Sequence, residues 1–385
     1  MLKYLTAGES HGRGLVALIE GIPAGLSLPV EFIDEDLARR QLGFGRGGRM
    51  RIEKDKALIM SGVRHGMTIG SPISLLIHNR DWENWSEKMA VGPVDAEFER
   101  ATRPRPGHAD LTGLLKTDQQ DVRNILERAS ARETAAKTAL GAIARRLLEE
   151  IGVTIVSHVV RIGGAAAPAG TLPGPGDLDT IDESPVRCFD ERVAREMVAE
   201  IKTAAADKDT VGGVFEVVVY GCPPGLGSHV SWDKRLNAEL CRAIAGIPAI
   251  KGVEIGAGFA LGGLRGSAAH DEIEYRDTEG YRRTTNRAGG IEGGMSNGEP
   301  IVVRAAMKPI PTLSSGLRTV DIDSKEEVTA MSERSDICAV PAAAVIGEAA
   351  VALQLAEAAL EKFGGDSLNE FLRNHRGYLE QIAGR

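Results

Sequence analysis

Apolar residues along this chain gather in short runs that are separated by glycine, proline and polar residues. Short apolar runs that are bounded by turn-forming residues are typical of β-strands. Five strands are therefore predicted, at Leu15–Ile19, Ile73–Ile77, Val153–Ile162, Val214–Tyr220 and Ile301–Ala306.

Other segments repeat their apolar residues at the spacing of a helix. This periodicity predicts four helices, over Val122–Glu150, Ala194–Ala205, Lys234–Ala245 and Ala342–Phe363. Gly364 and Gly365 follow the last of these, where glycine commonly ends a helix. The stretch Gly163–Ser184 is rich in Gly, Pro and Ala with few large apolar residues, so we expect an exposed loop there. No segment reads as a linker between two domains.

An internal repeat is visible in the pattern. Residues 12–27, GRGLVALIEGIPAGLS, align without gaps with residues 212–227, GGVFEVVVYGCPPGLG. Each copy has an apolar strand followed by matching Gly and Pro residues, which would specify the same turn. Chance similarity between Gly-rich segments is the alternative. A true repeat predicts a single domain over residues 1–385 with two pseudo-symmetric halves, of which only the first carries the polar cluster Gly8–His11.

The segment from Ile337 to Ala356 is apolar enough to resemble a membrane span. It is rich in alanine and contains Glu348 and Gln354, and an acidic residue at the middle of a bilayer is costly. We therefore predict a buried core helix and expect no membrane partner.

Composition narrows the class of protein. The 385 residues are 43% hydrophobic and 26% charged, as in an ordinary globular enzyme. The net charge of -8 argues against a nucleic-acid partner, so any anion site must come from a local cluster of cations. The four cysteines are scattered without a C-x-x-C pair, and the N-terminus lacks a secretory pattern, so a reduced, cytoplasmic protein is expected.

The first candidate site is Gly8-Glu9-Ser10-His11-Gly12, just before the first strand. Glycines let a ligand approach the backbone, and His11 can exchange a proton near neutral pH. A turn with a solvated histidine is the alternative. Adjacent Ser10 and His11 do not make a hydrolase triad, because nothing orients them.

The second candidate is an arginine-glycine segment over Arg39–Arg51. Gly43, Gly45 and Gly48 match G-x-G-x-x-G, but the segment follows a predicted helix, Asp34–Gln41, and a dinucleotide-binding motif would follow a strand. A loop with five arginines suits a small molecule that carries phosphate and carboxylate groups. A basic loop for subunit contact or solubility is the alternative. The arginines are Arg39, Arg40, Arg46, Arg49 and Arg51.

The third candidate is Arg103–Asp110, where prolines stiffen the chain around two arginines and His108. Neighbouring guanidinium groups disfavour a protonated His108, and a bound phosphate reverses this, so His108 is a plausible proton donor to a departing phosphate. His108 and Asp110 could instead bind a metal, but no further His/Asp cluster of suitable spacing supports that.

Charged residues also interrupt the apolar stripe of the helix predicted at Val122–Glu150. Arg132 and Glu133 fall on the stripe and Arg128 on its flank, and buried charges must be paired. A structural ion-pair network and ligand contact are equally compatible with the spacing.

Two later segments complete the candidates. Lys308–Thr312 ends a strand, and Ser335-Asp336 precedes the alanine-rich helix, with Pro341 in its first turn. Asp336 near a positive helix end would stay ionised, as a base should, although Ser335 or Asp336 could simply cap the helix. Gly289–Gly294 is a turn where a planar ligand could lie against the backbone, or an ordinary loop.

Taken together, these motifs identify a family. Six blocks occur in the order of the chorismate synthase family: GESHGRGLVALIEGIP, RPGHAD, ERASARETAAKTALGA, GGIEGGMSNG, AAMKPI and RSDICAVPAAAVIGEA. The chain resembles that family along nearly its whole length.

The resemblance implies an α+β fold, a β-α-β sandwich with long helices packed between antiparallel sheets, assembled as a homotetramer. It implies a carbon-oxygen lyase of the shikimate pathway of aromatic amino acid biosynthesis. The substrate would be 5-enolpyruvylshikimate 3-phosphate, which loses the C6 proton and the C3 phosphate in an anti-1,4-elimination that yields chorismate. Reduced FMN would be the cofactor, with NADPH as the direct or indirect source of electrons.

The resemblance also implies roles for individual residues. His11 would donate a proton to the flavin, His108 would assist phosphate departure, and Asp336 would keep flavin N5 able to accept the substrate proton, supported by Ser10 and Ser130. The implied flavin contacts are Arg128, Ala129, Ser130, Pro248, Ala249, Gly293, Lys308, Pro309, Ile310, Pro311, Thr312 and Arg334. Arg40 and Arg46 match an NADP-binding pair, and Arg46, Arg49, Arg105 and Arg132 are assigned to substrate anions. Pro311 stands where the family pattern has serine, so a hydroxyl contact to flavin is not expected there.

Two other functions remain open on sequence alone. A non-catalytic anion- or RNA-binding protein would use the Arg39–Arg51 segment but would not need His11 and His108. A metal-dependent phosphatase would lose activity with a chelator and would need no flavin.

Overall fold

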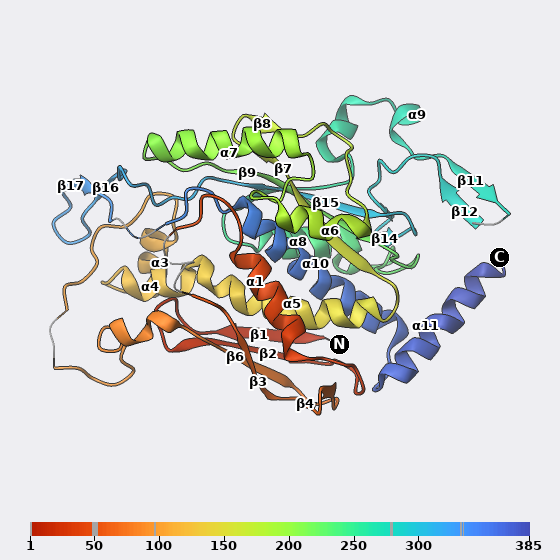
Figure 1. Ribbon diagram of the computed structural model, residues 1–385, viewed down its shortest axis with the longest axis horizontal. Helices are drawn as coiled ribbons and strands as arrows, with labels where there is room; N and C mark the ends of the chain where they lie inside the picture. The colour runs from red at the N-terminus through yellow and green to blue at the C-terminus, as the bar shows by residue number, and fades with distance from the viewer. Residues whose placement is uncertain (1, 48–52, 96–97, 278–279, 332, 334) are drawn as a thin grey trace.

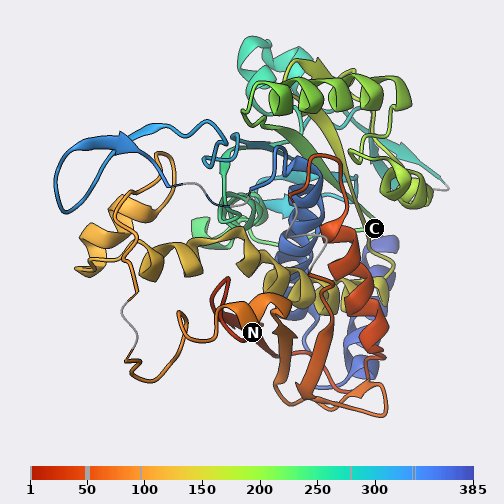
Figure 2. The ribbon, with the colours of Figure 1, turned by 60° about the vertical axis from the view of Figure 1, so that its left-hand side comes forward.

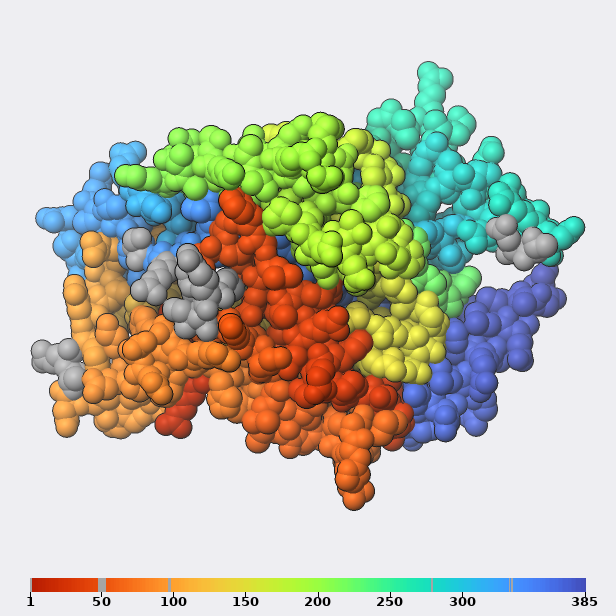
Figure 3. Space-filling view, in the orientation of Figure 1, coloured from red at the N-terminus to blue at the C-terminus, as the bar shows by residue number. Residues whose placement is uncertain are grey.

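Two antiparallel sheets enclose a layer of long helices in the computed structural model, which describes residues 2–47, 53–95, 98–277, 280–331, 333 and 335–385 (Figures 1 and 2). This arrangement confirms the predicted α+β sandwich. Each sheet turns one apolar face toward the helices, and this burial is the main source of stability for such a layered fold. In the space-filling view, the red and orange residues of the first half fill the lower part of the face, and the green residues of the second half fill the upper part (Figure 3).

The first sheet has the strand order β1-β2-β6-β3, and all its neighbours are antiparallel. Along β2, Leu15, Ala17 and Ile19 are buried against the helices, while Val16 and Leu18 on the other face are exposed. The alternation follows from the two-residue period of a strand. The strands are β1 (Lys3–Ala7), β2 (Gly14–Glu20), β3 (Ala57–Ser61) and β6 (Ile73–His78).

The second sheet has the order β10-β15-β9-β7-β8. Phe215 and Val217 of its central strand, β9, face helix α10 (Val340–Phe363), where a Cβ added to Gly347 would meet both side chains. The strands are β7 (Thr154–Ile162), β8 (Ala165–Ala166), β9 (Gly213–Tyr220), β10 (Ile250–Ile255) and β15 (Ile301–Met307). Among the described residues, four small hairpins lie outside the two sheets: β4 (Val63–Arg64) with β5 (Met67–Thr68), β11 (Ile273–Arg276) with β12 (Gly280–Arg283), β13 (Ile291–Glu292) with β14 (Met295–Ser296), and β16 (Arg318–Val320) with β17 (Glu327–Thr329).

Helices fill the space between the sheets and extend around its edges (Figure 1). The α-helices are α1 (Val30–Gln41), α3 (Asp110–Thr117), α4 (Arg123–Ala129), α5 (Thr134–Glu149), α6 (Leu178–Glu183), α7 (Glu191–Ala206), α8 (Leu236–Ala245), α9 (Gly266–Ala269), α10 (Val340–Phe363) and α11 (Leu368–Ala383). The 3₁₀ turns are η1 (Arg80–Asn84), η2 (Ala131–Glu133), η3 (Pro175–Asp177), η4 (Trp232–Lys234) and η5 (Gly258–Gly263).

Helix α10 forms the centre of the molecule. It is long and apolar enough to cross a membrane, but 83% of its most apolar stretch is buried inside the protein, as predicted for a core helix. Its first turn contains Pro341, and Gly364 ends it with a positive φ of 59°, both as expected. A Cβ on Gly141 of α5 would overlap the Cβ of Ala349, so this glycine lets α5 pack directly on α10.

The same order of elements occurs twice along the chain. The first half runs β1, β2, α1, β3, β6, α5, and the second runs β7, β9, α8, β10, β15, α10, with equivalent strand orders in the two sheets. The turns of the sequence repeat also share their hydrogen bonds. The Thr68 hydroxyl binds Leu26 N and Pro23 O, and the Ser296 hydroxyl binds Leu226 N and Pro223 O. We propose on these grounds a single domain of two pseudo-symmetric halves.

A buried ion network joins α1, α10 and the second sheet. The carboxylate of Glu348 accepts from Arg39 at 2.8 and 3.0 Å, from Arg187 at 3.1 Å and from the Ser157 hydroxyl at 2.6 Å. Asp36 and Asp182 add further carboxylates to Arg39. Arg39 is therefore occupied by structural ion pairs, and the sequence-based expectation that it binds a ligand is wrong.

Several predicted elements need correction. The helix expected over Val122–Glu150 is broken at Ser130, whose backbone is extended (φ -63°, ψ 141°). The stretch Gly163–Ser184 is not all loop, because β8, η3 and α6 lie within it and Ile181 of α6 is fully buried. The helix expected from Asp34 begins at Val30, and the one expected from Lys234 begins at Leu236 after the turn η4. Strands β1, β3 and β10 and helix α11 were not predicted.

The cysteines behave as the sequence suggests. All four are free thiols, and Cys188, Cys222 and Cys338 are buried. Burial raises the pKa of Cys222 to about 12 and that of Cys188 to about 11, so neither thiol is ionised near neutral pH.

Candidate active site

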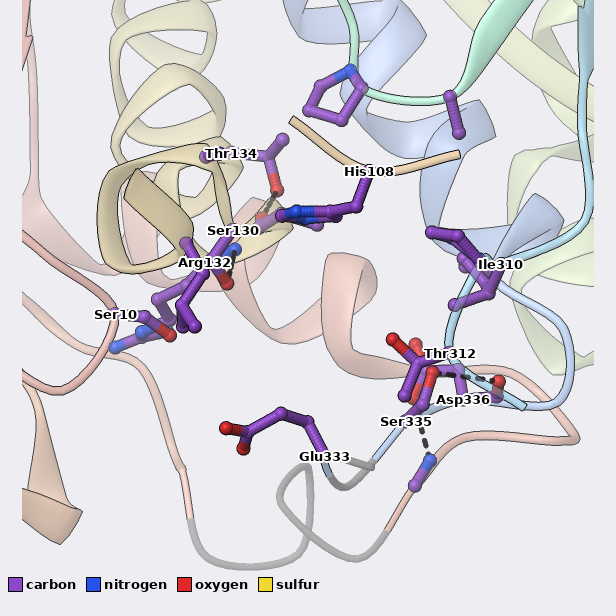
Figure 4. Close-up of a pocket in the computed structure, with 18 of the residues that line it drawn as sticks. Ser10, His108, Ser130, Arg132, Thr134, Ile310, Thr312, Glu333, Ser335 and Asp336 are labelled. Carbon is purple, nitrogen blue, oxygen red and sulfur yellow. Dashed lines mark hydrogen bonds between the residues drawn. The ribbon is translucent and has the colours of Figure 1, made fainter. Parts of the chain in front are cut away.

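A cavity of about 950 Å³ collects segments that are far apart in the sequence. Its walls come from the turn before β2, the end of α1, the α4–η2 junction, the loop before α3, the end of β15 and the start of α10. In Figure 4, Ser10, Ser130 and Arg132 lie along one side of the cavity, and Thr312 and Asp336 lie along the other. The volume is at the upper end of the range for small-molecule sites.

Two arginines, Arg40 and Arg132, line the floor of the cavity and share the carboxylate of Asp55, which is fully buried and is not among the described residues that line the cavity. Arg132 Nη1 lies 2.6 and 2.7 Å from the two carboxylate oxygens of Asp55, and Arg40 Nη2 lies 2.7 Å from Asp55 Oδ2. Burial acts to raise the pKa of Asp55, but the charges of Arg132 and Arg40 outweigh it and lower that pKa. Burial lowers the pKa of Arg40 to about 10, so it stays charged near neutral pH.

Two nitrogens of these guanidinium groups are buried and lack a hydrogen-bond partner. Arg40 Nε is buried without a hydrogen-bond partner, and so is Arg132 Nη2, which lies 3.7 Å from Glu53. Buried donors without partners are uncommon in native structures. Two guanidinium groups that share one carboxylate suit a ligand carrying phosphate or carboxylate oxygens.

The break at Ser130 shapes the wall above the floor. Its hydroxyl accepts from the backbone N of Arg132 at 3.3 Å. Such a side-chain cap starts a new turn, here η2, and interrupts the helix ladder. A continuous helix would run α4 straight into α5, whereas the break places Ser130, Ala131 and Arg132 on the cavity wall.

His108 is held by a buried carboxylate. Its Nδ1 lies 2.5 Å from Asp110 Oδ1, and Arg105 binds the same carboxylate through Nε at 2.8 Å. Because Asp110 only accepts, a proton on Nδ1 satisfies this contact. Arg105 Nη2, which only donates, lies 3.0 Å from Nδ1 and 3.5 Å from Nε2, and Nε2 is the nitrogen not engaged by Asp110. Arg105 Nη1 also donates to the Thr312 hydroxyl at 3.3 Å, so this wall is tied to the segment after β15. The sequence alternative of a metal held by His108 and Asp110 is not favoured, because the two side chains bond to each other.

His11 has a comparable partner. Its Nδ1 lies 2.9 and 3.0 Å from the two oxygens of Glu127, and its ring stacks on Trp85 with the centroids 3.9 Å apart. Arg128 donates to the carbonyls of Gly8 at 3.1 Å and Thr6 at 2.9 Å, which supports the turn that carries His11.

Asp336 faces the cavity from the approach to α10. Its Oδ1 accepts from Gly47 N at 2.7 Å, and its Oδ2 lies 3.2 Å from Arg46 Nη1. A Cβ on Gly47 would come within 2.7 Å of the Ser335 carbonyl, so glycine permits this close approach. Helix α10 begins at Val340 after Ala339, and the alternative that Ser335 or Asp336 caps it is therefore wrong.

The remaining wall is apolar and made of small side chains. It includes Ile247, Pro248, Ala249, Ala339, Ala342 and Ala343. Ala249 has a positive φ of 69°. This conformation is uncommon for a residue with a Cβ, and such strain is concentrated at functional sites. Small apolar residues beside a cationic floor leave room for a flat ring with charged substituents.

Most of the sequence-predicted site residues meet at this cavity. Those that line it are Ser10, His11, Arg40, Arg46, Arg105, His108, Ala129, Ser130, Arg132, Pro248, Ala249, Lys308, Ile310, Pro311, Thr312 and Asp336. Among the described residues that line the cavity, Arg128, Pro309 and Gly293 are not found; Gly293 lies in the turn between β13 and β14. Arg49 and Arg334 lie outside the described residues, as does Arg51.

Sequence reasoning missed several residues around the cavity. Asp55 and Asn79 bind Arg132, Glu127 binds His11, and Trp85 stacks on it. Trp85 had a signal, because two of the three tryptophans of the chain stand within one short polar segment. No sequence pattern marked the carboxylates of Asp55 and Glu127, because an isolated Asp or Glu is usually a surface residue.

Comparisons with known proteins agree with the sequence resemblance. A family profile described as chorismate synthase matches residues 2–360. The chain is 58% identical to a chorismate synthase of Desulforudis audaxviator over 383 residues, 99% of this chain and 98% of that protein. It is 56% identical to one of Symbiobacterium thermophilum, with all of both chains covered. A crystal structure of a chorismate synthase superposes with a TM-score of 0.81 at 41% identity, covering 100% of this chain and 99% of the other.

Proposed function

The chain belongs to the chorismate synthase family, and on that premise we propose that it converts 5-enolpyruvylshikimate 3-phosphate into chorismate and inorganic phosphate with reduced FMN as its cofactor. The observation that carries the proposal is one cavity lined by His11, His108, Asp336 and four arginines from separate segments. The reaction is an elimination of the C3 phosphate and the C6 proton, without net oxidation or reduction.

The arginines bind the anionic groups of the substrate in this proposal. One phosphate and two carboxylates need several cations, and Arg40, Arg46, Arg105 and Arg132 all line the cavity. Arg132 is held by Asp55 and Glu53, and Arg105 is held by Asp110, so both guanidinium groups are fixed in place at the cavity. Arg46, Arg105 and Arg132 are therefore assigned to the substrate anions.

His108 is assigned as the proton donor to the departing phosphate. Asp110 orients its ring through Nδ1, so Nε2 is the position from which a proton can be given to a phosphate oxygen. Arg105 adds positive charge beside the ring. Together they stabilise the negative charge that develops as the C–O bond breaks.

The residues present fit a flavin. The small apolar wall around Pro248, Ala249 and Ala343 suits a planar ring, and Lys308 and Thr312 offer polar contacts at its edge. When bound, reduced FMN supplies the transient electron density that the elimination requires. His11 and Asp336 are both assigned to the flavin, toward which His11 would hold a proton and Asp336 a negative charge. Ser10 and Ser130 are assigned as supporting polar groups. Pro311 lines the cavity without a hydroxyl to offer.

NADPH is proposed as the source of electrons, either directly or through a separate reductase. Arg40 and Arg46 both line the cavity, which supports contact of both with a ligand inside it. The free cysteines support a cytoplasmic location, where thiols stay reduced.

Turnover tests the function directly. Under anaerobic conditions, the protein with FMN, dithionite and 5-enolpyruvylshikimate 3-phosphate is expected to release chorismate and phosphate in equal amounts. A chelator should not change the rate. Phosphate release that stops with chelator and proceeds without flavin would favour a metal-dependent phosphatase, and RNA binding without turnover would favour a binding protein.

We also propose that the protein assembles as a homotetramer. The outer face of the first sheet exposes Leu5, Val16, Leu18, Leu58 and Met60. Leu5 pairs with Leu18 across β1 and β2, so the exposed apolar side chains form a continuous face. An apolar face of this kind is typical of a subunit interface.

Leu18→Asp is expected to shift the sedimentation profile from a tetramer to smaller species, because it places an unpaired charge in that face. Val91→Asp, at a fully exposed position outside the sheet, is the matched control and should leave the assembly unchanged. A wild-type protein that sediments as a monomer would contradict the assembly.

A further inference from the structure

Glu127 contacts His11 at three points. Both carboxylate oxygens lie within hydrogen-bond distance of His11 Nδ1, at 2.9 and 3.0 Å, and the backbone N of His11 donates to Oε2 at 2.8 Å. The backbone carbonyl of Glu127 also accepts from Ser10 N at 2.9 Å. Glu127 thus holds both the main chain and the ring of this segment.

Glu127 lies outside the described lining of the large cavity. His11 lines that cavity, whereas Glu127 is not among the described residues that do, and its side chain is only 3% exposed. On its other side, Glu127 borders a separate small cleft of about 190 Å³ together with Glu9, Lys88, Asp121, Arg123 and Asn124. Glu127 therefore lies behind His11.

A carboxylate in this place controls the protonation of the ring. Because an ionised carboxylate only accepts hydrogen bonds, it fixes the proton on Nδ1 and leaves Nε2 as the nitrogen that it does not bind. A negative charge beside an imidazole attracts its protonated form and not its neutral form, so removing the charge removes that attraction. Stacking on Trp85 fixes the ring plane from another side.

We propose that Glu127 is a positioning residue of the reaction, which orients the ring of His11, holds its proton on Nδ1 and supplies the negative charge beside it. It acts through the imidazole and touches neither substrate nor cofactor. The inference rests on the proposed function for its kinetic consequence, but the orientation and tautomer of His11 can be measured without turnover.

Other charged groups surround the pair of Glu127 and His11. Arg123 Nη1 lies 2.9 Å from Glu127 Oε1, and Arg123 also contacts Glu333 at 3.3 Å. Lys88 lies over Trp85, and Asp81 accepts from the Trp85 indole at 3.1 Å. Burial acts to raise the pKa of Glu127, but hydrogen bonds from His11 and the charge of Arg123 outweigh it and lower that pKa, so the carboxylate is ionised at neutral pH.

The chain contains a matched pair that serves as a control. His158 Nε2 lies 3.0 Å from Glu216 Oε2, and both side chains are buried in the second sheet. Neither is among the described residues that line the cavity. Like Glu127, Glu216 also binds an arginine, Arg304. Glu216→Gln therefore removes the same charge from a comparable pair outside the described lining of the cavity.

The test is the pH dependence of kcat in Glu127→Gln. The amide oxygen can still accept from Nδ1, so the orientation is largely kept while the charge is lost. We expect kcat at pH 8 to fall about 10-fold or more in Glu127→Gln, with KM nearly unchanged. Loss of a proton donor itself typically lowers the rate by about 10²–10⁴-fold, so the effect of its partner should be smaller. The alkaline limb should move to lower pH by about 1 unit or more, the size of effect that one nearby opposite charge has. The difference in kcat between Glu127→Gln and wild type should become smaller toward pH 6.

Two further variants and a spectrum make the result decisive. Glu127→Asp keeps the charge and should return the alkaline limb toward that of wild type, and Glu216→Gln should leave the profile unchanged. NMR of protein labelled with ¹⁵N-histidine should show His11 protonated at Nδ1 in wild type and Glu127→Asp, with that state less populated at pH 8 in Glu127→Gln.

The inference is overturned if Glu127→Gln is folded and its profile superimposes on wild type, or if Glu216→Gln shifts the profile equally. A His11 signal protonated only at Nε2 would overturn it as well. Absence of chorismate formation by the wild-type protein would instead overturn the proposed function, and the NMR result would then still decide the role of Glu127.

Discussion

Replacing His108 with alanine should lower kcat by about 10²–10⁴-fold, the usual loss when a general acid is removed. The reason is that His108 Nε2 is the position on this wall from which we assign a proton to the departing phosphate. Flavin binding, measured by the change in flavin fluorescence, should change little, because the apolar wall at Pro248 and Ala249 is untouched.

The control for this variant is His229→Ala, at an exposed histidine outside the cavity lining, which should keep full activity. Equal losses of flavin binding and turnover in His108→Ala would assign His108 a structural role instead. The charge of Asp110 supports a role for His108 in proton transfer. Burial acts to raise the pKa of Asp110, but hydrogen bonds from His108 and Arg105 outweigh burial and lower that pKa. Asp110 is thus an anion at neutral pH, as an orienting partner of an imidazolium should be.

Glu348→Ala should lower the free energy of unfolding by about 3–5 kcal/mol, because it leaves buried guanidinium groups without their shared carboxylate. Glu348 accepts from Arg39 and Arg187, and both arginines are nearly fully buried. Urea unfolding followed by circular dichroism measures the loss. The control is Glu196→Ala, which removes an exposed ion pair with Arg192. Loss of such a surface pair should change stability by only about 0.5 kcal/mol.

The stability lost in Glu348→Ala should depend on pH. Burial acts to raise the pKa of Glu348, but the charges of Arg39 and Arg187 outweigh it and hold that pKa below its ordinary value of 4.5. A carboxyl with a depressed pKa contributes stability that is present above the ordinary pKa and is lost as pH falls through the depressed one. The gap between wild type and Glu348→Ala should therefore be widest near neutral pH and narrow in acid. A gap that is constant with pH would show that lost packing, not charge, causes the effect.

The sequence by itself determined the elements with strong local patterns. The five predicted strands are all present, because an apolar run bounded by turn residues has few other ways to bury its side chains. Helix α10 was predicted almost to the residue, since Pro341 and Gly364 mark its two ends. The motifs also located His11, His108, Arg132 and Asp336 as candidates for one site.

Only the tertiary structure decided how those residues are used. Arg39 and Arg40 are neighbours on α1, yet Arg39 binds Glu348, 309 residues away, while Arg40 lies on the cavity floor. Glu127 stands 116 residues from His11 and had no local signal at all. Periodicity reflects interactions within a few residues, whereas the partner of a charge depends on which distant segments pack together. The helix break at Ser130 also depends on tertiary structure. Arg132 can form its ion pair with Asp55 only once the sheet and the helices have packed together.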